Sequence, residues 1–139
     1  MKKLLFISLA IILTLGTMSC SAQTKDKKKS VTSISKKVIV YYFHFTQRCN
    51  TCHAVEDNSK KAVEILYASQ VKKGEYAFEG YNLDEAKSKE LGKKLGVEGQ
   101  TLLVTCGNKK EDITSQGFMY AHDFDKLKAE IKKAVDKVK

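Results

Sequence analysis

Two cysteines, Cys49 and Cys52, stand where a long apolar run gives way to an amphipathic segment. The run, Val38–Phe45, is β-branched and aromatic without alternation, which predicts a strand buried on both faces. Apolar residues at helical spacing follow over 50–69 and predict a helix that starts at the cysteines. A strand covered on both faces and followed at once by a helix indicates an α/β fold.

The spacing of the two cysteines suits redox chemistry. Side chains three positions apart share one face of a helix, so Cys49 and Cys52 can close a disulfide. Cys49 lies at the predicted helix N-terminus, where unpaired N–H groups and the helix dipole favour a thiolate. Arg48 and His53 flank the pair and add positive charge. We therefore interpret Cys49 as the nucleophile and Cys52 as the resolving thiol, exchanging with a dithiol or disulfide of a partner protein.

The rest of the chain predicts a βαβ unit followed by a ββα unit around one central mixed sheet. Asn82 or Asp84 can cap the second helix, which ends near Gly96. The expected further elements are strands at 75–81, 100–105 and 111–118, a short polar helix before Gly96, and a long C-terminal amphipathic helix from Phe124 to Val138.

This order of elements, with Cys-x-x-Cys after the first strand, resembles the thioredoxin fold over 38–138. Gln100-Thr101, followed by an apolar strand, resembles the thioredoxin segment that holds a cis-proline and threonine beside the disulfide. The resemblance therefore implies a thioredoxin-like sandwich with Gln100 next to the two thiols. It also implies thiol–disulfide exchange as the activity.

A narrower resemblance is to small exported bacterial thioredoxin-like proteins, labelled as the nitrophenyl-compound nitroreductase subunit ArsF family. The residues that carry it are Tyr42-Phe43-His44, Arg48-Cys49, Thr51-Cys52 and Val55-Glu56. The sequence holds no flavin or nicotinamide fingerprint, so we expect no such cofactor and no nitro-group reduction by this chain alone.

Three positions depart from the thioredoxin pattern. Arg48 replaces a tryptophan, Phe43 replaces a buried acidic residue, and Gln100 replaces the cis-proline, in a chain that has no proline. Because the cis-proline keeps metals off the thiols, a copper, zinc or arsenic site at Cys49, Cys52 and His53 is an alternative. Cys-x-x-Cys-His also spells the c-type haem attachment motif, for which Met119 offers an axial ligand. A purely structural disulfide is the remaining alternative.

The N-terminus reads as an export signal. A basic pair precedes an apolar stretch over 4–15, and Cys20 then follows in a loose lipobox. We expect a lipoprotein signal peptide over 1–20, lipidation of Cys20, a Lys/Ser/Thr-rich tether over 21–37 and the domain over 38–139. Ordinary cleavage before Gln23 is the alternative. Either route places the domain outside the cytoplasm, facing the periplasm or the cell surface, where disulfides persist.

The net charge of +9 is concentrated before the domain. From Val38 onward 17 basic residues face 15 acidic ones, so we expect no nucleic-acid partner, a membrane contact only through the lipid, and a monomer. Cys106 directly follows the strand predicted over 100–105, which begins beside Gln100 and runs away from it. At strand rise it lies about 17 Å away from that end, so we expect a buried or hairpin-edge thiol outside the redox pair.

Overall fold

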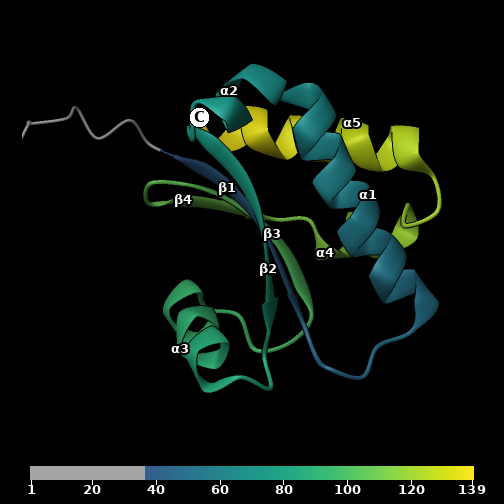
Figure 1. Ribbon diagram of the computed structural model, residues 1–139, viewed down its shortest axis with the longest axis vertical. Coiled ribbons are helices and arrows are strands. Elements are labelled where there is room, and N and C mark those ends of the chain that lie inside the picture. Colours follow the sequence, from purple (N-terminus) through teal and green to yellow (C-terminus); the bar gives the residue numbers. More distant parts are fainter. Residues whose placement is uncertain (1–36) are drawn as a thin grey trace, which may run out of the picture. The chain divides into compact units, whose positions relative to one another are not determined.

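The computed structural model describes residues 37–139, whose strands form one four-stranded mixed sheet (Figure 1). The predicted signal peptide, the expected lipidation site at Cys20 and the predicted tether up to residue 36 lie outside the described residues. In chain order the elements are β1 (Val38–His44), α1 (Asn50–Leu66), α2 (Ala68–Lys72), β2 (Tyr76–Asn82), α3 (Ala86–Leu95), β3 (Thr101–Cys106), β4 (Lys109–Asp112), α4 (Thr114–Met119) and α5 (Phe124–Val138).

The sheet has the strand order β2-β1-β3-β4. Strand β1 pairs in parallel with β2 and antiparallel with β3, and β3 pairs antiparallel with β4. In the β1–β3 pair Val38 lies opposite Cys106 and Phe43 lies opposite Thr101. The two central strands are therefore the apolar runs, which have neighbours on both edges and are covered on both faces.

Helices cover the two faces of the sheet unequally. Helices α1 and α5 pack together on one face, with α2 and α4 beside them, whereas α3 covers the other face (Figure 1). The larger core on the α1–α5 face includes Tyr42, Val55, Leu102, Leu127 and Ile131. The smaller core under α3 consists of Tyr41, Phe43, Leu83, Val97 and Leu103.

A parallel β1-α1-β2 unit and an antiparallel β3-β4-α5 unit thus surround one mixed sheet. This confirms the predicted thioredoxin-like α/β sandwich. Within the described residues, no helix is both long and apolar enough to span a bilayer.

The prediction of a strand over 111–118 is wrong beyond Asp112. The Asp112 carboxylate accepts hydrogen bonds from the Thr114 backbone N–H at 2.9 Å and from its hydroxyl at 2.6 Å. The Thr114 hydroxyl oxygen in turn accepts from the Leu102 N–H at 3.0 Å. These bonds end the strand in a turn, and the chain continues as the short helix α4.

The first predicted helix is also interrupted. Tyr67 adopts a non-helical backbone between α1 and α2, and its ring packs on Tyr76 with ring centroids 4.7 Å apart. The break lets the end of the helical region turn toward the start of β2. No glycine or proline lies at Tyr67, so the helical spacing of apolar residues in the sequence continues past the break.

Candidate active site

The loop that carries the cysteines is fixed to the segment after β2. The Thr46 backbone N–H donates to the Asp84 carboxylate at 2.8 Å, and the Asn82 side-chain amide donates to the Thr46 hydroxyl at 2.8 Å. The hydrogen bond from the Thr46 backbone holds the pKa of Asp84 below its usual value. Asn82 and Asp84 were expected to cap a helix. Glu85 instead occupies the N-cap of α3, and the two residues hold the loop before Cys49.

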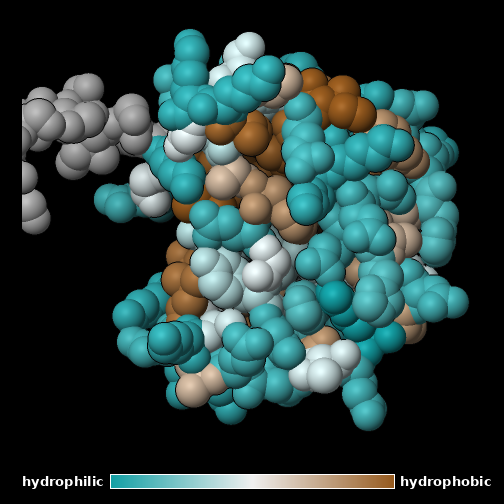
Figure 2. Space-filling view, viewed as in Figure 1, coloured by the Kyte–Doolittle hydropathy of each residue, from teal (hydrophilic) through white to brown (hydrophobic). Residues whose placement is uncertain are grey.

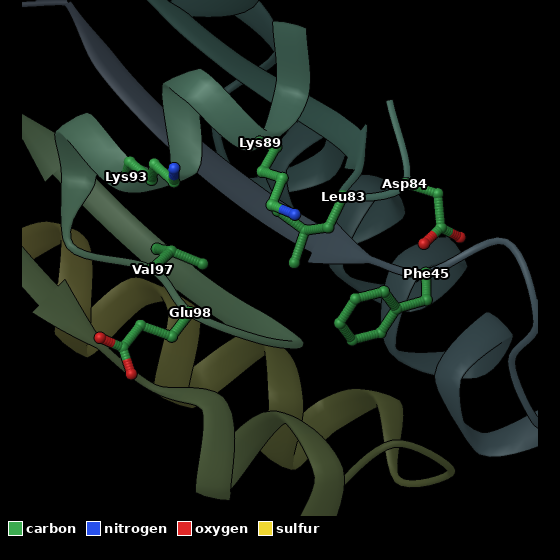
Figure 3. Close-up of a pocket in the computed structure, with 7 residues that line it drawn as sticks. All are labelled: Phe45, Leu83, Asp84, Lys89, Lys93, Val97 and Glu98. Atoms are coloured by element: carbon green, nitrogen blue, oxygen red, sulfur yellow. The ribbon is translucent and has the colours of Figure 1, made fainter. Parts of the chain in front are cut away.

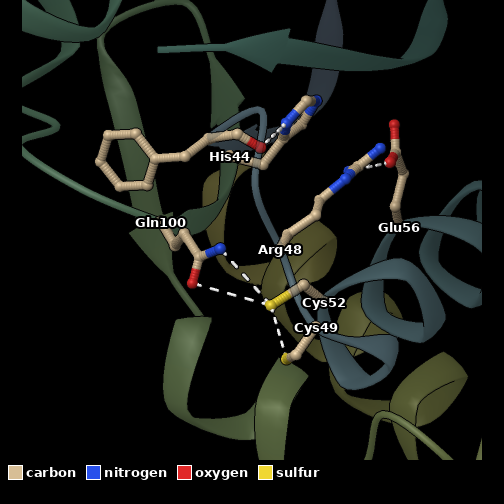
Figure 4. A network of polar contacts seen from close by, with 7 residues as sticks. His44, Arg48, Cys49, Cys52, Glu56 and Gln100 are labelled. Carbon is tan, nitrogen blue, oxygen red and sulfur yellow. Dashed lines mark hydrogen bonds and ion pairs between the residues drawn. The ribbon is translucent and has the colours of Figure 1, made fainter. Parts of the chain in front are cut away.

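The two thiols lie together at the start of α1 (Figure 4). Cys49 is the N-cap residue, with an extended backbone, and Cys52 lies in the first turn. Their Sγ atoms are 3.0 Å apart. Cys49 is exposed, whereas Cys52 retains only 4% of its accessible surface. An incoming disulfide can therefore reach Cys49 but not Cys52.

Several donors converge on the exposed thiol and lower the pKa of Cys49. The first is the side chain of Cys52, and the backbone N–H groups of Cys52 and Thr51 add to it. These N–H groups belong to the first helical turn, where they have no partner inside the helix. The first turn of α1 holds no acidic residue that would oppose a thiolate. The fold thus favours the reactive form of Cys49.

Gln100 lies beside the buried thiol (Figure 4). Its amide Nε2 donates to Cys52 Sγ at 3.4 Å, and its Oε1 lies 3.8 Å from the same sulfur. The residue stands directly before β3, in the position that the thioredoxin resemblance implied. Peptide bonds of the described residues are all trans, including those around Gln100.

The charge of Arg48 is directed at Glu56 and not at Cys49. Its guanidinium forms an ion pair with Glu56, two turns along α1, and the two side chains keep 16% and 23% of their exposure. Gly80 of β2 makes room for this carboxylate, because a Cβ there would lie 2.7 Å from Glu56 Oε1. The pairing explains why backbone N–H groups and Cys52, rather than Arg48, lower the pKa of Cys49. Glu56 was not predicted as a site residue, although its i, i+4 spacing from Cys52 places it on the same helix face.

His53 and Met119, which the metal and haem alternatives invoke beside the two thiols, both lie on the surface. His53 is exposed, and its backbone N–H donates to the Cys49 carbonyl at 3.2 Å. Among the described residues, no three His, Cys, Asp or Glu side chains form a cluster that could hold a metal ion. Met119 is 70% exposed at the end of α4. His44 is half-buried, and its Nδ1 lies 2.9 Å from the Phe45 carbonyl oxygen.

The strand beneath the thiols presents Tyr42, not Phe43, to them. Phe43 was expected at the place of a buried acid, but it belongs to the core under α3, on the opposite face of the sheet. Tyr42 belongs to the α1 face and is fully buried. Burial raises the pKa of the Tyr42 hydroxyl, and the neighbouring Cys52 raises it further. Strict side-chain alternation along β1 is the signal that separates the two residues.

A hollow of about 460 Å³ opens near this end of the sheet (Figure 3). Its lining mixes apolar and charged side chains: Phe45, Leu83, Asp84, Lys89, Lys93, Val97 and Glu98. Both thiols lie outside it. The exposed large apolar side chains of the described residues are Phe45, Ile65 and Met119. In the view of Figure 2 most of the surface is hydrophilic, and apolar side chains gather toward the end of α1 near α2.

Cys106 lies far from the pair, as predicted. It ends β3 opposite Val38, at the start of β1, whereas Cys49 follows the other end of that strand. It is buried, with 4% exposure. The antiparallel register thus separates this thiol from the dithiol by the length of the sheet.

Comparison with known proteins adds no assignment. No family model matches the chain, and no curated protein is similar to it. One solved structure, described as "Structure of a malarial protein", aligns with a TM-score of 0.46 and 20% sequence identity, covering 71% of this chain and 98% of that one. A similarity at this level bears on neither activity nor partner.

Proposed function

We propose that this protein is a thiol–disulfide exchange protein whose redox pair is Cys49 and Cys52. The observation that carries the proposal is their asymmetry: an exposed thiol with a lowered pKa lies 3.0 Å from a buried one. Nucleophilic attack needs an accessible thiolate, and resolution needs a second thiol within reach that does not compete for the substrate.

The exchange has two steps. The Cys49 thiolate attacks one sulfur of a partner disulfide, forms a mixed disulfide and releases the other partner sulfur as a thiolate. Cys52, after losing its proton to solvent, then attacks Cys49 Sγ, closes the Cys49–Cys52 disulfide and releases the second partner thiolate. Both released thiolates take up protons, so the partner disulfide is reduced and the protein dithiol is oxidised. In the reverse direction the protein oxidises a partner dithiol.

Single cysteine variants test this proposal. Cys49→Ser is expected to abolish reduction of a disulfide substrate, because no accessible thiolate remains. Cys52→Ser is expected to stop after the first step and accumulate a mixed disulfide, which intact mass measures and which can capture the partner protein. A Cys49→Ser variant with wild-type turnover would show that the pair is not the active site.

The proposal includes export and a lipid anchor at Cys20, supported by the basic pair and apolar stretch that precede it. An oxidising compartment suits exchange with partner disulfides. Radiolabelled palmitate is expected in the wild type and absent from Cys20→Ala. An unlabelled wild type would instead support ordinary cleavage before Gln23.

A further inference from the structure

Three hydroxyl groups of the described residues are buried without a hydrogen-bond partner of ordinary geometry: those of Tyr42, Ser59 and Tyr67. A buried donor without a partner is destabilising, so each such group requires an explanation. Tyr42 differs from the other two by its position, because it lies on the α1 face of β1 and has Cys52 among its neighbours. Phenylalanine would fill the same space without the orphan hydroxyl.

Charged and titratable groups lie near Tyr42 on its own face of the sheet. They come from α1, from the loop before it and from the end of β1: Cys52, Glu56, Arg48 and His44. The residues opposite Tyr42 in the two neighbouring strands are Gly80 and Leu102, which carry no charge. Burial is the largest cause of the raised pKa of Tyr42, and Cys52 is the neighbouring group that raises it most. Of these groups Glu56 is ion-paired with Arg48, whereas Cys52 is the one that gains a charge during the exchange.

We infer that the Tyr42 hydroxyl is a built-in hydrogen-bond donor for Cys52 Sγ at the moment when that sulfur becomes a thiolate. This inference rests on the proposed exchange function and assigns a residue to its second step. A thiol is a weak acceptor, whereas a thiolate is a strong one, so the hydroxyl gains its full hydrogen bond only when charge develops on Cys52. A donor fixed in advance toward developing charge stabilises the reacting state more than the resting state.

The chemistry of the step is unchanged by this donor. In the mixed disulfide, Cys52 loses its proton to a solvent base and its thiolate attacks Cys49 Sγ. The Cys49–Cys52 bond forms as the bond from Cys49 to the partner sulfur breaks, and the partner leaves as a thiolate. Tyr42 keeps its own proton throughout, because its raised pKa holds the hydroxyl protonated at neutral pH. Gln100 supplies the second donor to the same sulfur, at 3.4 Å.

Removing the donor has two opposite effects on the rate of the second step. At neutral pH fewer molecules carry the Cys52 thiolate; a loss of about tenfold is at the low end for a hydrogen bond to a charged group. The thiolate that remains is more nucleophilic, by about threefold for this tenfold loss. The variant Tyr42→Phe should therefore resolve the mixed disulfide about threefold more slowly at neutral pH and about threefold faster at high pH, where ionisation is complete. If the substitution acted only on the structure, its effect on the rate of the second step would not change sign with pH.

Ellman's disulfide offers a direct assay with the full chain. Each step of exchange releases one coloured thiolate, so stopped-flow absorbance separates attack by Cys49 from resolution by Cys52. The Cys52→Ser variant cannot carry out resolution, so the absorbance phase that it lacks is the second step. Tyr67→Phe is the matched control, since it removes another orphan hydroxyl from the same core, next to Tyr76 rather than to the thiols.

We expect Tyr42→Phe to slow only the second phase at neutral pH, to move the pH at which that phase is half-maximal upward, and to leave the first phase as in the wild type. Tyr67→Phe should change neither phase. A second phase of Tyr42→Phe that matches the wild type at every pH, with the variant folded by circular dichroism, overturns the inference alone. If the wild type lacks two phases, or Cys49→Ser retains them, the proposed function itself fails.

Discussion

The ion pair between Arg48 and Glu56 neutralises the positive charge that precedes the exposed thiol Cys49 in the chain. Both side chains are largely buried, at 16% and 23% exposure, and Gly80 leaves space for the carboxylate. Glu56→Gln keeps the shape of the side chain and removes its charge. We expect the variant to be less stable and its Cys49 to be more reactive, because the guanidinium that precedes Cys49 in the chain loses its counter-charge.

The burial of the pair sets the magnitude. Exposed pairs contribute about 0–1 kcal/mol, and breaking a fully buried pair costs about 3–5 kcal/mol. A pair with about a fifth of its surface exposed falls between these limits, so Glu56→Gln should lower the free energy of unfolding by about 2 kcal/mol. In a folded part of this size each kcal/mol shifts Tm by about 4–8 °C, which gives a loss of about 8–16 °C.

Urea unfolding of the reduced proteins measures the loss of stability, and the rate of alkylation by iodoacetamide at neutral pH measures the reactivity of Cys49. The matched control is Glu90→Gln, which breaks an i, i+4 pair with Lys94 whose side chains are 67% and 69% exposed and should cost under about 0.5 kcal/mol. A Glu56→Gln variant refutes the reasoning if it lowers the free energy of unfolding by no more than Glu90→Gln does and leaves the alkylation rate of Cys49 unchanged. In that case the pair neither stabilises the fold nor restrains the charge of Arg48.

Three further predictions concern packing, the third thiol and pH. Gly117→Ala should cost about 1–3 kcal/mol in urea unfolding, because the added Cβ lies 2.9 Å from a buried leucine of β3. Gly99→Ala, which meets no atom within 4 Å, should stay within about 0.5 kcal/mol. Cys106→Ser should leave both exchange phases within about twofold of the wild type, since the β1–β3 register holds Cys106 at the far end of the sheet; a folded variant that lost turnover would contradict the register. Because the pKa of Cys49 is lowered by folding, the free energy of unfolding of the dithiol should rise with pH through the window between that lowered pKa and the ordinary value near ~8.5. This gain in the free energy of unfolding is lost as pH falls through the lowered pKa. Urea unfolding at a series of pH values measures it, and a Cys49→Ser variant whose free energy of unfolding rose with pH as steeply as that of the wild type would refute the assignment.

The sheet could be predicted from the sequence because its central strands are apolar on both faces. Strands β1 and β3 are unbroken apolar runs rich in β-branched and aromatic residues, which is typical of the interior of a sheet. The short elements could not be predicted in the same way. Helix α4 depends on the Thr114 hydroxyl reaching the Leu102 N–H, and the break at Tyr67 depends on packing against Tyr76. Both are contacts between separate elements, which the pattern within one element does not contain.

The candidate site likewise has one part that the sequence predicts and one part that it does not. The lowered pKa of Cys49 was predictable, because the donors around it belong to the first turn of α1 and their positions follow from where the helix begins. The role of Arg48 was not predictable, because its partner Glu56 is brought close to it only when the helix forms. A site built on the first turn of α1, with the Cys52 side chain and backbone N–H groups as donors, keeps its thiolate stabilised however Arg48 pairs. Side-chain charges such as Arg48 can then hold the loop in place without setting the basic reactivity of Cys49, which is why we assign reactivity to the helix start and place the second step with Tyr42 and Gln100.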